Sequence, residues 1–106
     1  MTISMDDRRK GFESKWVHDA ELRFQMEARR NRALGEWAAA KKGLTGQALE
    51  DLVGSVIAAD LEEAGDEDVF RKLRSELDAS VSDAAIRDKM REYLQTAMDQ
   101  TAQDAR

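Results

Sequence analysis

The stretch that decides the fold is residues 46–64, which read GQALEDLVGSVIAADLEEA. Its apolar side chains recur at three- and four-residue steps, at Leu49, Leu52, Val53, Val56, Ile57, Leu61 and Ala64. That spacing is typical of one face of an α-helix. Because this is the strongest apolar stripe in the chain, we expect a helix that buries the stripe against other helices.

The composition of the whole chain agrees with a helical protein. Its 106 residues include no proline, no cysteine and only six glycines, so long stretches lack any helix breaker. A chain of this length forms one domain with a single core. Without cysteine, disulfide bonds and thiolate chemistry are excluded.

Before this central helix, the sequence predicts another over about residues 19–42. Its core-facing positions are Ala20, Phe24, Ala28, Leu34, Trp37 and Ala38. Lys41 and Lys42 suit the negative end of the helix dipole, and Gly43 can adopt the left-handed conformation that ends a helix.

Two further helices follow the central one. Asp66 is the expected N-cap of the third, whose buried face comprises Val69, Phe70, Leu73 and Leu77. Ser82 is the expected N-cap of the fourth, where Val81 and Ile86 have the spacing of a hydrophobic staple. The fourth helix buries Ile86, Met90, Tyr93, Leu94 and Ala97, and we expect it to fray over residues 99–106. Short connections make successive helices antiparallel neighbours, so the predicted fold is all-α, a compact four-helix bundle.

Charge is unevenly distributed along the chain. The net charge is −5, yet residues 1–42 hold ten basic and seven acidic residues, whereas residues 43–106 hold seven basic and fifteen acidic ones. This asymmetry suggests either a match between the two halves or a basic segment directed at an acidic partner. Ordinary solvated helix faces are the simpler alternative.

Signs of catalysis are weak. The single histidine, His18, has no nucleophile near it in sequence and is more typical of a packing or capping residue. The acidic run DLEEAGDED, residues 60–68, fails as a calcium loop because Arg71 stands where the bidentate glutamate is needed. We therefore expect no enzyme activity, no metal and no cofactor.

The chain also lacks a recognisable export signal or membrane span. Charged residues occupy the N-terminus where a signal peptide has its apolar stretch, and the longest apolar run is far shorter than the roughly 20 residues of a span. We expect a cytoplasmic protein with no direct membrane insertion.

Two polar residues lie among core positions and call for a structural explanation. Asp60 lies on or beside the apolar stripe of the central helix, so we expect it to pair with an arginine of the first or third helix and to fix their register. Asn31 is a similar structural polar candidate. The nearby cluster Arg29, Arg30 and Arg32 could form a nucleic-acid or nucleotide surface, but the three point in different directions around a helix, which favours a solvated or ion-paired face.

The most unusual segment is residues 6–21, DDRRKGFESKWVHDAE. Extending the first helix backward places Met5, Arg9, Phe12 and Trp16 at steps of four, three and four. When Phe24 is taken to mark the core side of the helix, Phe12 and Trp16 lie progressively farther around the helix from that side. The patch would face solvent or a partner, flanked by Arg8, Lys10 and Lys15. A basic, aromatic segment that is only marginally helical alone suits a groove on another protein. The alternative is that the two rings fold back as a lid on the bundle.

Four stretches together carry a resemblance: DDRRKGFESKWVHDAELRF, EARRNRALGEWAA, KKGLTG and AADLEEAGDEDVFRKL. They closely resemble the zeta inhibitor subunits of bacterial F-type ATP synthases, over nearly the whole chain and least in the last helix. Gly11 and Trp16 depart from the family pattern, where alanine and phenylalanine are expected.

The resemblance implies a globular four-helix domain, residues 19–106, preceded by a mobile inhibitory segment, residues 1–18. In that family the segment enters the interface between catalytic and non-catalytic subunits beside the rotor, and blocks ATP hydrolysis while permitting synthesis. The implied partners are the catalytic head and rotor stalk of the ATP synthase, which would hold the protein at the inner membrane; no DNA is expected as a partner.

Overall fold

Four helices and their short connections make up the fold. The computed structural model describes the backbone of residues 5–62 and 66–104, and the side chains of residues 20–61 and 66–104. The helices are α1 (Met5–Lys42), α2 (Gly46–Glu62), α3 (Glu67–Glu76) and α4 (Asp83–Asp104). The predicted all-α class with four helices is confirmed.

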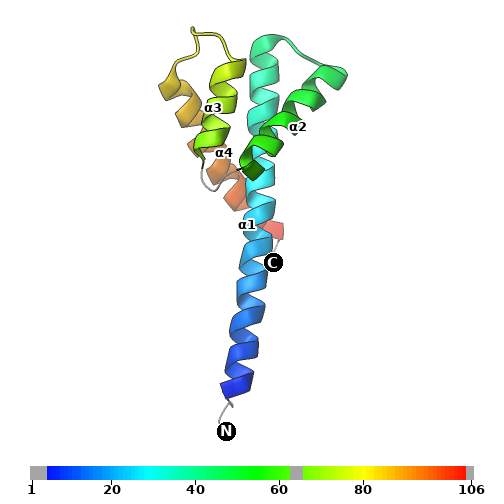
Figure 1. Cartoon of the computed structure of the whole chain (residues 1–106), viewed down its shortest axis with the longest axis vertical. Coiled ribbons are helices and arrows are strands. Elements are labelled where there is room, and N and C mark those ends of the chain that lie inside the picture. Colours follow the sequence, from blue (N-terminus) through cyan, green and yellow to red (C-terminus); the bar gives the residue numbers. More distant parts are fainter. Residues whose placement is uncertain (1–4, 63–65, 105–106) are drawn as a thin grey trace.

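The first helix is longer than predicted. We expected it to begin at about Asp19, but α1 is one helix from Met5, with 38 residues that span about 57 Å at 1.5 Å per residue. The other three helices surround only its C-terminal half, and its N-terminal half projects away from them (Figure 1). The molecule therefore measures 63 × 24 × 22 Å.

The core lies between the C-terminal half of α1 and the other three helices. Its buried members are Leu34, Ala38, Ala39, Leu52, Val56, Val69, Leu73, Leu77, Ile86 and Met90, and Trp37, Leu49, Phe70, Val81 and Tyr93 pack against them half-buried. Most core positions predicted for the second, third and fourth helices are thus confirmed. Ala64 lies outside the described residues.

Some core predictions fail at the end of the bundle from which α1 projects. Phe24 is 64% exposed and Leu61 is 69% exposed, and Ala20 is exposed too. The helical period placed each of them on the correct side, but neighbouring helices do not extend far enough to cover them.

Close packing between α1 and α2 depends on a glycine. A Cβ atom on Gly35 would lie 2.7 Å from the Cα of Val53 and 2.9 Å from its Cγ2, distances that real Cβ atoms do not tolerate. The absence of a side chain at Gly35 therefore lets the two backbones approach each other.

The predicted helix ends are partly correct. Gly43 has the expected left-handed φ of 71°, and the hydroxyl of Ser82 accepts a hydrogen bond from the N–H of Ala85 at 3.0 Å, as an N-cap does. Asp66 precedes α3 but makes no side-chain cap bond, because its carboxylate binds Arg30 instead. The expected fraying from residue 99 is also wrong: α4 continues to Asp104, and Thr101 is only 5% exposed.

Candidate partner interface

The predicted partner-binding residues all lie on the projecting half of α1. Met5, Arg8, Arg9, Lys10, Phe12, Lys15 and Trp16 fall within its helical backbone, and their side chains, like that of His18, lie outside the described residues. We call residues 5–19 of α1 the arm.

The helical register of the arm corrects one inference from the sequence. Positions 12 and 16 precede Arg30 and Leu34 by 18 residues, which is about five complete turns. Both Arg30 and Leu34 are buried in the bundle, at 2% and 0% exposure. Measured against the true core positions, positions 12 and 16 continue the bundle-facing side of α1 rather than drift off it. The arm differs from the rest of α1 because α2, α3 and α4 lie beside the C-terminal half of α1 and not beside the arm (Figure 1).

A polar network fixes α1 at the point where it enters the bundle. Nη1 of Arg30 donates to Asp66 at 2.7 Å, and Nη2 lies 3.4 Å from Oδ1 of Asp60. Asn31 donates from Nδ2 to Oδ2 of Asp60 at 2.9 Å and accepts from Nε of Arg30 at 3.1 Å. We call Arg30, Asn31, Asp60 and Asp66 the Arg30 network.

The Arg30 network links α1, the last turn of α2 and the residue that precedes α3. The structure brings Asn31 and Asp60 together, and supplies Asp60 with an arginine partner from the first helix. Sequence reasoning did not identify Arg30 and Asp66 as members. The available signal for Arg30 was its position four residues before Leu34, on the buried side of the helix.

The two neighbouring arginines are also engaged. Arg29 donates to the hydroxyl of Thr101 at 3.2 Å and pairs with Asp104. Arg32 binds Glu50 at 2.8 Å, and this hydrogen bond together with the charge of Glu50 raises the pKa of the Arg32 guanidinium. The arginine cluster therefore forms an ion-paired face directed at α4, at α2 and at Asp66 before α3, as its spacing suggested, rather than a free basic patch.

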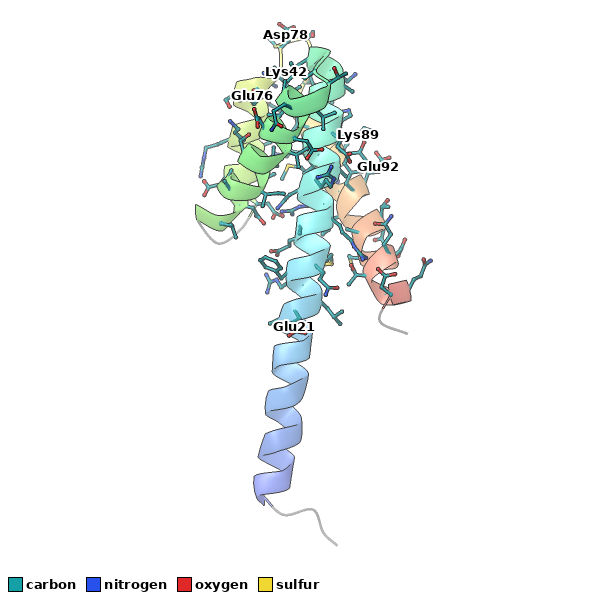
Figure 2. All side chains as sticks on the ribbon, turned by 90° about the vertical axis from the view of Figure 1, so that its right-hand side faces the viewer. Glu21, Lys42, Glu76, Asp78, Lys89 and Glu92 are labelled. Carbon is teal, nitrogen blue, oxygen red and sulfur yellow. The ribbon has the colours of Figure 1, made fainter. Side chains whose placement is uncertain are left out.

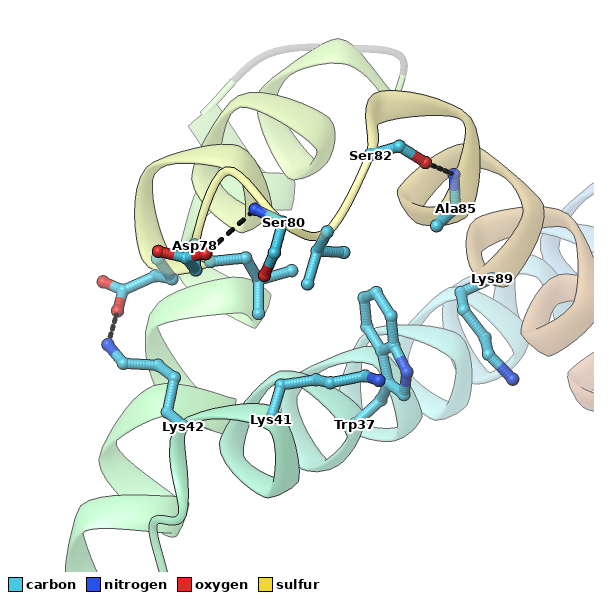
Figure 3. Close-up of a pocket in the computed structure, with 11 residues that line it drawn as sticks. Trp37, Lys41, Lys42, Asp78, Ser80, Ser82, Ala85 and Lys89 are labelled. Atoms are coloured by element: carbon cyan, nitrogen blue, oxygen red, sulfur yellow. Dashed lines mark hydrogen bonds and ion pairs between the residues drawn. The ribbon is translucent and has the colours of Figure 1, made fainter.

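A cavity of about 820 Å³ lies at the opposite end of the bundle, near the C-terminus of α1. Trp37 and Lys41 of α1 and Lys89 of α4 line it, and the loop residues Asp78, Ser80, Val81 and Ser82 form its far wall (Figure 3). Its charges are largely satisfied internally: hydrogen bonds from Lys42 and Lys72 lower the pKa of Glu76, and a hydrogen bond to Glu92 raises the pKa of Lys89.

Within the described ranges 20–61 and 66–104, no group of three or more His, Cys, Asp or Glu side chains could hold a metal ion. Over the same described part, no helix is both long enough and apolar enough to cross a membrane. What the described structure presents is one long helix that extends beyond the bundle and is held at its base by the Arg30 network.

These observations define a class: a small all-helical protein that presents one long helix beyond its own core. The family model of the ATPase inhibitor subunit zeta matches residues 1–100, and the chain belongs to this family. A search of curated proteins finds no match.

Proposed function

We propose that this protein inhibits ATP hydrolysis by the F-type ATP synthase without catalysing a reaction itself. Its arm, with residues 1–4, would enter the interface between catalytic and non-catalytic subunits beside the rotor stalk. Membership of the ATPase inhibitor family supports the proposal, and the observation that carries it is the extension of α1 beyond the bundle (Figure 1). The protein would be held at the inner membrane through the synthase alone.

The sequence of the arm suits helix-in-groove binding. Arg8, Arg9 and Lys10 can steer the encounter with an acidic surface, because exposed charges mainly affect association. Phe12 and Trp16 can act as anchors, because buried aromatic side chains carry much of the energy of an interface.

The base of the arm supports the same function. α1 continues from the arm into the bundle without interruption, and the Arg30 network ties it to α2 and to the start of α3. A helix that is held at its base leaves the bundle in a defined direction. Fewer orientations are then lost on binding, which favours affinity.

The alternative of a nucleic-acid or nucleotide binder is less well supported. It relies on Arg29, Arg30 and Arg32, and each of these already binds a carboxylate of the same chain. Phosphate binding would have to compete with those pairs, and Arg30 is buried.

The test is a titration of ATP hydrolysis by the cognate enzyme with three variants. Deletion of residues 1–15 should abolish inhibition and leave the melting temperature of the bundle almost unchanged. Replacing Phe12 and Trp16 with Ala should mainly speed dissociation. Replacing Arg8, Arg9 and Lys10 with Gln should mainly slow association and weaken its salt dependence.

Full inhibition by the truncated protein would contradict the proposal. A large fall in melting temperature on truncation would instead support the lid alternative, in which the two rings belong to the core.

A further inference from the structure

The large apolar side chains that remain exposed gather at one end of the bundle. Within residues 20–61 and 66–104 they are Phe24, Leu61 and Met98, at 64%, 69% and 45% exposure. Leu61 lies in the last turn of α2, next to Asp60 of the Arg30 network. Met98 lies three residues before Thr101, which binds Arg29. All three are therefore at the end from which the arm leaves.

Phe24 lies on the side of α1 that faces α2. Phe24 precedes Asn31 by seven residues and Gly35 by eleven, about two and three turns, so all three face the same way. Asn31 binds Asp60 of α2, and Gly35 lies against Val53 of α2. Phe24 thus continues the α2 side of α1 below the point where α2 ends, and Leu61 is the last side chain described at that end of α2.

Met98 lies on a different side. Met98 is near Thr101, which binds Arg29 of α1. Arg29 is two residues before Asn31, so it points about 200° around α1 from the side that faces α2. Figure 2 shows α2 and α4 on opposite sides of α1. Met98 is therefore a matched control: an exposed apolar residue at the same end of the bundle but on the α4 side.

The described basic residues near this end, Arg23 and Arg30, are paired within the chain. Arg23 pairs with Glu27 at 3.3 Å, and Arg30 with Asp60 and Asp66. A partner that covers Phe24 and Leu61 gains apolar burial, and among the described residues at this end it meets no unpaired cation. This favours an apolar protein surface over an anionic ligand.

We propose that Phe24 and Leu61 form a second docking surface, which binds an apolar patch on the ATPase beside the mouth of the groove that takes the arm. This inference rests on the proposed function. The ATPase is the expected partner of this surface because Phe24 is only eight residues after Trp16 on the same helix. A partner that encloses the arm is brought directly against this surface. The protein then holds its target at two places, one on the arm and one on the bundle.

The experiment compares Phe24→Gln, Leu61→Gln and the double variant with Met98→Gln, all in the full-length protein. Glutamine keeps a high helix propensity, and all three side chains are exposed, so melting temperatures should remain close to that of the unchanged protein. Association and dissociation are measured on the purified cognate ATPase, together with inhibition of hydrolysis. We expect each docking substitution to speed dissociation by about tenfold, the scale set by burial of one large apolar side chain, and Met98→Gln to change it less than twofold.

The arm variant Phe12→Ala with Trp16→Ala separates failure of this inference from failure of the proposed function. If the arm variant loses binding while the docking double variant binds as the unchanged protein does, the second surface is refuted and the arm proposal stands. If neither variant alters binding, both fail. Light scattering adds a further check: a dimer that the docking substitutions dissociate would assign the surface to a second copy of this chain and overturn the proposal.

Discussion

The two halves of α1 belong to one helix but are held by different means. In the C-terminal half, Leu34, Ala38 and Ala39 are fully buried, and Gly35 admits the backbone of α2. In the N-terminal half, backbone hydrogen bonds continue, but the other helices lie elsewhere (Figure 1). Because an isolated helix is marginal in water, the comparison teaches that packing stabilises the first region, whereas the second lies beyond the helices that supply this packing.

The largest expected difference comes from truncating one apolar residue inside the bundle and one at its edge, where the projecting half of α1 begins. Leu34→Ala should lower the free energy of unfolding by about 2–5 kcal/mol, because it leaves a cavity in the core. Phe24→Ala should change it by less than about 0.5 kcal/mol, because that ring is mostly in solvent. Denaturant titration of both variants measures the contrast, and equal losses would mean that the core extends into the projecting half.

The junction between the two regions should show the next largest effect. Asp60→Ala should lower the free energy of unfolding by about 1–3 kcal/mol, because it leaves buried Arg30 with fewer partners. Glu50→Ala is the matched control, since it removes an exposed partner of Arg32 and should have an effect below about 0.5 kcal/mol. If the two variants lose the same stability, the Arg30 network does not anchor the base of the arm.

The smallest effect concerns the far end of α1, where Lys42 and Lys72 both bind Glu76. These hydrogen bonds lower the pKa of Glu76 from its ordinary 4.5. The stabilisation is therefore complete above pH 4.5 and is lost as the pH falls through the lowered native value. Glu76→Gln should cost about 0.2–1 kcal/mol at pH 7.

The difference in stability between the unchanged protein and Glu76→Gln should become smaller at acidic pH. Thermal unfolding of the two proteins between pH 7 and pH 3 provides the measurement. A difference that is independent of pH would rule out the ion pairs as its source.

The sequence predicted those parts of the fold that depend on local chemistry. The apolar period of residues 46–61 identified the buried side of α2, and Gly43 and Ser82 marked a helix end and a helix start by their backbone and capping preferences. None of these needs knowledge of distant residues.

The errors share one physical cause, which is that the positions of distant residues cannot be read from the local sequence around a residue. Phe24 and Leu61 have core spacing but extend past the helices that would cover them. Thr101 lies in a polar stretch and yet is buried, because Arg29 lies 72 residues away in sequence and within hydrogen-bond distance in space. Asp66 has the position of a cap but is bound by Arg30 instead.

The sequence proposes a location for the candidate site but not the geometry of its base. The basic and aromatic composition of residues 6–21 indicated a partner-binding segment, and helical spacing indicated a pairing role for Asp60. The Arg30 network and the apolar surface of Phe24 and Leu61 depend on where three helices end, which only the folded arrangement determines.

The most direct test of the arm as a partner-binding helix is amide hydrogen exchange along α1, measured in the free protein and in its complex with the cognate ATPase. Residues 30–42 should be protected in both states, because they are packed in the bundle. Residues 5–19 should exchange rapidly in the free protein and become protected by at least about tenfold in the complex, because the partner supplies the packing that the bundle does not. Arm amides that gain no protection in the complex, while the bundle does, would contradict the account.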